Sequence, residues 1–185
     1  MENRATKSNV VLIILTSRGV RFFRMETLAK QLGVRLLARG LWLATAESCT
    51  GGWLAEALTS IPGSSQWFER GFVTYSDKAK EEMLGVRTET LARFGAVSRE
   101  TVEEMALGAL RHSHAQISAA ITGIAGPDGG TAEKPVGTVW LAFAGDNEPT
   151  LSVLKQFQGD REAVRRLAVT AALEGLLERL GGHDQ

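Results

Sequence analysis

The chain has 185 residues, the usual size of one domain built around a single hydrophobic core. Its 21 basic residues balance 21 acidic residues, which excludes the broad positive field of a nonspecific nucleic-acid binder. With 44% hydrophobic and 23% charged residues, the composition is that of a folded globular protein, neither disordered nor membrane-embedded. A single cysteine, Cys49, excludes an intramolecular disulfide and predicts a cytoplasmic protein.

Residues 1–24 read as an amino-terminal extension outside the core. The apolar stretch within 9–16 is much shorter than the roughly 20 residues that span a bilayer. Arginines follow it where a secretion signal would have a small-residue cleavage site. We therefore predict that the domain occupies residues 25–182, with Met25 as an alternative start.

The first half of the domain alternates helices and strands. Apolar residues on one face predict a helix over 25–39, and the run LWLATA at 41–46 predicts a buried strand. A glycine turn separates that strand from a helix over 53–59. The elements predicted next are a strand over 71–75, a helix over 78–84 capped by Ser76 or Asp77, and a helix from the cap Ser98 to Arg111.

The second half predicts three strands and a long helix. A strand over 117–122 leads into a glycine-rich loop, 123–130, and strands over 136–144 and 151–157 read as a hairpin about the turn 145–147. Asp160 is placed to cap a final helix that ends near Leu180. The whole pattern predicts one layered α/β/α domain with a mixed central sheet of about five strands.

Ser48 stands where a strand ends and a helix is about to begin. Helix amides at such a point can face an oxyanion or a phosphate, so the serine is placed for attack, although a plain helix cap fits equally well. The three histidines lie at polar positions, which leaves Lys80 as the candidate base. The helix dipole and partial burial would disfavour its charged form; the alternative is a solvated surface lysine.

Further candidates each have a purely structural alternative. Tyr75 ends a predicted strand and can donate to a substrate or relay a proton, or else it fills the core. Thr122 precedes the glycine loop and reads as a site residue or as strand packing. Glycines of the loop permit close approach to a ligand, and Arg161 can grip a phosphate or form a surface ion pair.

Longer motifs carry more information than these single residues. In chain order they are AESCTGGWLAEALTSIPGSSQWFERGFVTYS, GAVS, TGIAGPDGGTAEKPVGTVW and FQGDREAVRR. Together they resemble the carboxy-terminal domain of the CinA competence-damage proteins over residues 25–180. Stand-alone members of that family are nicotinamide-nucleotide amidases, so the resemblance implies hydrolysis of nicotinamide mononucleotide to nicotinate mononucleotide and ammonia.

The resemblance also implies roles for particular residues. The family's catalytic serine, tyrosine, lysine and threonine fall on Ser48, Tyr75, Lys80 and Thr122. The expected acyl transfer requires no metal and no organic cofactor. The expected partners are a small nucleotide substrate and a second copy of the chain in a homodimer. The residues predicted to bind the substrate are Thr50, Gly51, Gly52, Gly123, Gly126 and Arg161.

Three points stay open at the level of sequence. Asp77 stands where the family commonly has asparagine, and a carboxylate there would raise the pKa of Lys80 unless it points outward as a cap, which we expect. Cys49 is a rival nucleophile, because a helix amino terminus lowers a thiol pKa. The rival of another class is a nucleotide-binding module, linked to competence, that catalyses nothing.

Overall fold

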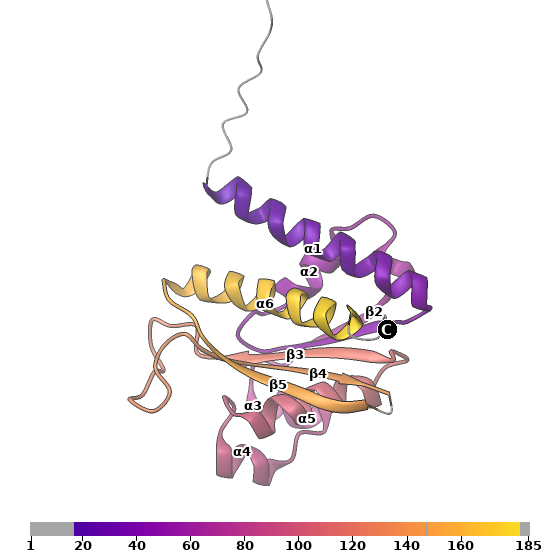
Figure 1. The fold of residues 1–185 in the computed structure, drawn as a ribbon. Helices are drawn as coiled ribbons and strands as arrows, with labels where there is room; N and C mark the ends of the chain where they lie inside the picture. Colours follow the sequence, from indigo (N-terminus) through magenta and orange to yellow (C-terminus); the bar gives the residue numbers. More distant parts are fainter. Residues whose placement is uncertain (1–16, 147, 182–185) are drawn as a thin grey trace, which may run out of the picture.

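The computed structural model describes residues 17–146 and 148–181, which form one five-stranded sheet with helices on both faces (Figure 1). One helical layer contains α1 (Ser17–Arg39), α2 (Trp53–Thr59) and α6 (Arg161–Gly181). The other contains α3 (Asp77–Leu84), α4 (Thr88–Phe94) and α5 (Arg99–Arg111). Between them lie β1 (Leu43–Glu47), β2 (Phe68–Val73), β3 (Ile117–Gly123), β4 (Thr138–Gly145) and β5 (Glu148–Gln156). The predicted layered α/β/α domain is confirmed.

The sheet is mixed, with strand order β2-β1-β3-β4-β5. Strand β1 runs parallel to β2 and β3, whereas β4 is antiparallel to both of its neighbours. The carboxyl ends of the three parallel strands therefore meet at one edge, where the connection after β1 runs to α2 in one helical layer and the connection after β2 runs to α3 in the other. Ligands of open α/β sheets bind at such a switch point, because the loops diverge there and leave a crevice.

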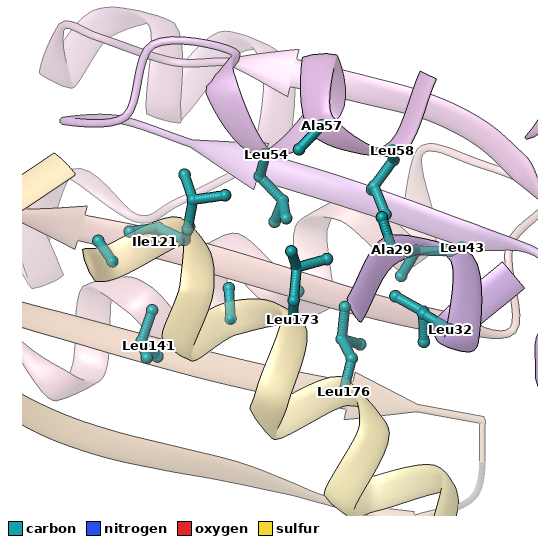
Figure 2. Packing of buried hydrophobic residues seen from close by; sticks show 14 of the residues in the cluster. Ala29, Leu32, Leu43, Leu54, Ala57, Leu58, Ile121, Leu141, Leu173 and Leu176 are labelled. Carbon is teal, nitrogen blue, oxygen red and sulfur yellow. The ribbon is translucent and has the colours of Figure 1, made fainter. Parts of the chain in front are cut away.

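Side chains of unequal size face the two helical layers. Along β1, β3 and β4 the larger apolar residues point toward α1, α2 and α6, whereas alanines point toward α5. Figure 2 shows Leu43, Ile121 and Leu141 of the sheet against Leu173 and Leu176 of α6. Because period-two alternation fixes which face each residue occupies, it places Glu47 on the α2 side of the sheet.

The structure corrects several element bounds. Strand β2 begins and ends earlier than predicted, since its extent is set by parallel pairing from Phe68 to Val73 with β1. Tyr75 therefore lies beyond the strand. Helix α4 and a short 3-10 turn at Ser64–Gln66 were not predicted, and α1 begins at Ser17, upstream of 25. No helix in the described ranges has an apolar stretch long enough to cross a bilayer.

The helix caps largely follow the sequence. Ser76 is the cap of α3, and its hydroxyl oxygen accepts from the amide of Ala79 at 3.1 Å. Asp77, the other candidate, is the first residue of the helix instead. Ser98 caps α5 and accepts from the amide of Thr101, and Asp160 accepts from the amide of Ala163 at the start of α6. These contacts satisfy amides that a helix leaves free at its start.

Candidate active site

Residues 47–52, which we call the serine turn, join β1 to α2. The amide of Ser48 still donates to the Ile121 carbonyl of β3 at 2.9 Å, so the serine is anchored to the sheet. The chain then turns through Gly51 and Gly52, both at positive φ, a conformation that glycine adopts without the clash of a side chain. Ser48 thus lies at the carboxyl edge of the parallel strands, as predicted.

A buried carboxylate holds this turn from the helix side. The side chain of Glu47 is 1% exposed and accepts from the amides of Gly52, Leu54 and Ala55 at 2.8 to 3.1 Å. These are free amino-terminal amides of α2, where a negative charge is favoured. Sequence reasoning missed this role, although a glutamate at the end of an apolar strand was the available signal.

Lys80 lies on α3 and its side chain is buried, with 1% of its surface exposed. Its Nζ is 3.3 Å from Ser48 Oγ, 2.9 Å from the Thr74 carbonyl oxygen and 3.5 Å from that of Ser76. The structure therefore brings together two side chains that are 32 positions apart in sequence. The alternative of a solvated surface lysine is wrong.

Burial lowers the pKa of Lys80, because a charged amine loses its hydration in the interior. The carboxylate of Asp77 opposes this and raises the pKa, with one oxygen 3.9 Å from Nζ. Asp77 was expected to face outward as a helix cap. Its side chain is indeed 61% exposed, but it does not cap α3 and it stays within ion-pair distance of Lys80.

The serine and lysine open into a cleft of about 260 Å³ at the edge of the sheet. Its walls come from the serine turn, the β2–α3 connection, the end of β3, the glycine loop 123–130 and α6. The lining residues are Ser48, Cys49, Tyr75, Lys80, Ala96, Val97, Thr122, Gly123, Ile124, Ala125, Gly126, Asp128, Gly129 and Arg161. The contribution of 96–97 was not predicted, because it depends on where α4 and α5 pack.

Arg161, at the start of α6, closes one side of the cleft. Its guanidinium donates to the Gly126 carbonyl oxygen and to the Tyr75 hydroxyl oxygen, both at 2.8 Å. Tyr75 is 61% exposed, so its ring does not fill the core. Because its oxygen accepts from Arg161, the hydroxyl proton of Tyr75 stays available to a ligand.

Thr122 lines the cleft and is 1% exposed. Its hydroxyl donates to the Ala96 carbonyl oxygen at 2.8 Å, which joins β3 to the segment before α5. A hydroxyl has one proton and two lone pairs. With that proton engaged, Thr122 presents an acceptor to the cleft.

The predicted substrate-binding residues divide into two groups. Gly123, Gly126 and Arg161 line the cleft. Thr50, Gly51 and Gly52 lie outside its lining, and the amides of the two glycines donate to Ser48 and Glu47 within the turn. Their role in binding substrate stays a prediction. Among the described residues, no group of three or more His, Cys, Asp or Glu side chains is arranged to hold a metal ion.

Cys49, the rival nucleophile, is buried and 6% exposed. Loss of hydration on burial is the main cause that raises the pKa of its thiol to about 12. The thiolate is the reactive form, so this thiol is a poor nucleophile at neutral pH.

The fold and the cleft define a class of protein: an α/β domain that sets a serine against a buried lysine at the carboxyl ends of its parallel strands. The amino-acid sequence identifies the family within this class. The chain belongs to the CinA C-terminal domain family, whose family model matches residues 25–180.

Relatives and solved structures agree with this assignment. The nicotinamide-nucleotide amidohydrolase PncC of Escherichia coli (strain K12) is 57% identical over 152 residues, 82% of this chain and 92% of that protein. The protein of the same name from Enterobacter agglomerans is 54% identical over 154 residues, 83% of this chain and 94% of that protein. The crystal structure of competence/damage inducible protein CihA from Agrobacterium tumefaciens has a TM-score of 0.82 and 50% identity, covering 85% of this chain and 96% of that one.

Proposed function

We propose that this protein hydrolyses the carboxamide of nicotinamide mononucleotide to nicotinate mononucleotide and ammonia. Ser48 is the nucleophile and Lys80 is its general base. The single observation that carries the proposal is the 3.3 Å approach of Lys80 Nζ to Ser48 Oγ inside the cleft. Support also comes from relatives above 50% identity that have the name nicotinamide-nucleotide amidohydrolase.

The surroundings of Lys80 suit a neutral amine. A neutral amine has two N–H groups and one lone pair, and the carbonyl oxygens of Thr74 and Ser76 are placed to accept the two hydrogens. The lone pair then faces the hydroxyl of Ser48. Since burial lowers the pKa of Lys80, this protonation state becomes accessible closer to neutral pH.

The reaction proceeds by two acyl transfers. Ser48 Oγ attacks the carboxamide carbon as its proton passes to Lys80, and the carbonyl electron pair moves to oxygen. Collapse of this oxyanion breaks the C–N bond, and the leaving nitrogen takes the proton from Lys80 to depart as ammonia. A water molecule then gives a proton to Lys80 and attacks the acyl carbon. The C–Oγ bond breaks, Ser48 recovers its proton, and the carboxylate product forms.

The other cleft residues hold the substrate. Arg161 and the free amides of the glycine loop bind the phosphate, since a guanidinium and backbone N–H groups together match phosphate oxygens. The free hydroxyl proton of Tyr75 donates to the bound nucleotide. Thr122, whose own proton is engaged, accepts from the amide nitrogen of the carboxamide.

Ammonia release tests the proposal directly. The wild-type protein is incubated with nicotinamide mononucleotide, nicotinamide and the dinucleotide side by side, and we expect turnover to be highest with the mononucleotide. Ser48→Ala is expected to lose at least about a thousandfold in kcat, as nucleophile deletions do in serine hydrolases. An active Ser48→Ala protein beside a dead Cys49→Ala protein would instead identify the thiol as the nucleophile.

The competing function is a nucleotide-binding module linked to competence. The observation in its favour is the pair of glycine-rich segments, which suits a binding protein as well as an enzyme. Tight binding of nicotinamide mononucleotide by calorimetry, with no ammonia released by the same preparation, would favour the module.

We also propose that the protein is a cytoplasmic homodimer. The apolar stripe of α6 does not supply the contact, because Val164, Leu173 and Leu176 are buried in the domain's own core. The exposed apolar side chains of β5, Leu151 and Leu154, are better placed to meet a partner. Light scattering coupled to size-exclusion chromatography measures the mass; a monomer at micromolar concentration would contradict the proposal.

A further inference from the structure

We infer that Arg165 is a positioning residue for the serine turn, and that the backbone amide of Cys49 is the oxyanion donor it positions. The inference rests on the proposed amide hydrolysis and adds to it the group that receives the developing negative charge. Arg165 lies on α6, and it does not line the cleft. It therefore acts on the reaction only through the turn.

Arg165 grips two consecutive carbonyl groups of the turn. Its Nε donates to the Cys49 oxygen at 3.1 Å, and one terminal nitrogen donates to the Thr50 oxygen at 2.7 Å. The guanidinium also lies over the ring of Trp53, 5.3 Å from the ring centroid. Two hydrogen bonds and one stacking contact fix the planar group, so the orientation of both peptide planes is fixed as well.

Most amides of the turn are already used. Their hydrogen bonds are Ser48 to Ile121 O, Gly51 to Ser48 O, Gly52 to the Glu47 carboxylate, and Trp53 to Thr50 O. Within the part of the chain that the structure describes, the amides of Cys49 and Thr50 donate to no other residue. Only Cys49 of these two lines the cleft. Its amide is also the first backbone N–H that follows the nucleophile Ser48 in the chain.

Planar trans peptides connect Arg165 to that amide. The Thr50 carbonyl accepts from Arg165, and the N–H on the same peptide belongs to Gly51, which donates to Ser48 O at 3.0 Å. The carbonyl of Ser48 shares its peptide group with the N–H of Cys49. This N–H points the opposite way because the peptide is trans. Each bond in such a chain polarises the next, by about 10–30% per bond. The charge of Arg165 therefore strengthens the Cys49 amide as a donor.

Arg165 also restrains the peptide group that follows Cys49. Its second hydrogen bond holds the Cys49 carbonyl, so the peptide planes before and after this residue are both constrained. An oxyanion donor must be oriented before the reaction, because reorienting it during the reaction would consume the stabilisation it gives. Loss of Arg165 should thus slow the chemical step, while the proposed binding of the phosphate by Arg161 and the glycine loop changes little.

The test compares Arg165→Met with Arg166→Met. Methionine keeps an unbranched stem against Trp53 but removes both donors. Arg166 is the next residue of α6, and its guanidinium makes no hydrogen bond or ion pair within the described ranges. We expect Arg165→Met to lower kcat about 10- to 100-fold, somewhat less than deleting a donor itself, with KM for nicotinamide mononucleotide within about threefold. Arg166→Met should keep wild-type values, and Arg165→Lys, which restores one donor, should recover part of the loss.

A second readout separates this inference from the proposed substrate. A small fluorophosphonate forms a bond between Ser48 Oγ and phosphorus, fluoride leaves, and the serine proton passes to Lys80. This step also develops negative charge on oxygen, so we expect Arg165→Met to slow phosphonylation by a factor similar to that on kcat, as measured by intact mass. If wild type is phosphonylated but releases no ammonia, the proposed function fails, and the ratio of labelling rates still decides the role of Arg165.

A purely structural role gives a different pattern. It would lower the melting temperature and raise KM while the phosphonylation rate stayed at the wild-type value. That result for Arg165→Met overturns the inference. If Arg165→Met does not fold, the same rates are measured on Arg165→Lys, and labelling and turnover equal to wild type there overturn it equally.

Discussion

The two glycine-rich segments of this protein look alike in sequence but differ in how their backbone polar groups are hydrogen-bonded. In the serine turn 47–52, Glu47, Ile121 and Arg165 engage most of the backbone polar groups. In the glycine loop, the amides of 125, 126 and 128–130 donate to no other residue in the described part of the chain, and Pro127 between them has no N–H. Both segments contain positive-φ glycines at the carboxyl edge of the sheet.

The difference indicates a division of labour. A turn whose hydrogen bonds are internal holds Ser48 rigidly against Lys80, as a reacting group requires. A loop with unused amides can give those amides to a ligand, and Lys134 beyond it donates to the Phe94 and Val97 carbonyl oxygens. Changes near the turn should therefore act on kcat, and changes near the loop should act on KM.

The largest expected effect is on the base next to the turn. Lys80→Met removes the amine and keeps the apolar stem, so we expect kcat to fall about 10²- to 10⁴-fold, the range for loss of a general base. KM should change little. The control is Lys78→Met on the same helix, since Lys78 is exposed and forms ion pairs with Glu81 and Glu82. Single-turnover kinetics of ammonia release measure both; equal rates would remove Lys80 from the mechanism.

Arg161→Met tests the proposed role of the glycine-loop side of the cleft in binding substrate. Loss of a charged hydrogen bond to phosphate corresponds to about 1.5–3 kcal/mol, so KM should rise about 10- to 100-fold. We expect kcat to stay within a few-fold of wild type, because Arg161 contacts Gly126 and Tyr75 rather than the serine. Nicotinamide riboside, which lacks the phosphate, serves as control and should show no such change in KM. A drop confined to kcat would contradict the division between turn and loop.

Glu47→Gln tests how far the rigidity of the turn matters. Gln can still accept at one oxygen but has lost the charge that three amides share. We expect the free energy of unfolding to fall by about 2 kcal/mol, within the range for hydrogen bonds to buried charged groups, and kcat to fall about tenfold. Glu56→Gln, an exposed site on α2, should change neither. Urea denaturation and steady-state kinetics give the two numbers, and unchanged kcat would show that the turn holds without this carboxylate.

The smallest expected effect is a shift in pH dependence. Burial lowers the pKa of Lys80, so activity should rise with pH as the amine loses its proton, with a midpoint below the ordinary 10.5. Asp77 raises that pKa, and Asp77→Asn should move the rising limb to lower pH. A profile of kcat/KM against pH for both proteins measures the shift; movement toward higher pH would contradict it.

The lowered pKa of Lys80 also determines the direction in which the stability of the fold changes with pH. Between the folded pKa and 10.5 the unfolded state binds more protons at residue 80 than the folded state does. The contribution of Lys80 to the free energy of unfolding therefore rises with pH through that window and levels off above it. In Lys80→Met this contribution should be absent, which thermal unfolding over the same pH range can measure.

Much of this protein was predictable from local sequence. Short-range chemistry fixed the strand before Ser48, the caps at Ser98 and Asp160, and the two glycine segments, because alternation, capping and positive φ depend on near neighbours. Resemblance to a family then pointed to Ser48, Tyr75, Lys80 and Thr122. The bounds of β2 and the presence of α4 were missed, since pairing with β1 and contacts such as Thr90 with Glu104 of α5 decide them.

Only the tertiary structure decided which groups are free to react. Sequence established that a serine turn and a lysine exist, but not that Lys80 is buried at 3.3 Å from Ser48 or that Asp77 stays near it. Nor did it reveal that Glu47 and Arg165 engage most polar groups of the turn, while the Cys49 amide donates to no other residue in the described ranges. Hydrogen-bond partners and desolvation arise from residues brought together by folding, and spacing along the chain does not encode those distances directly.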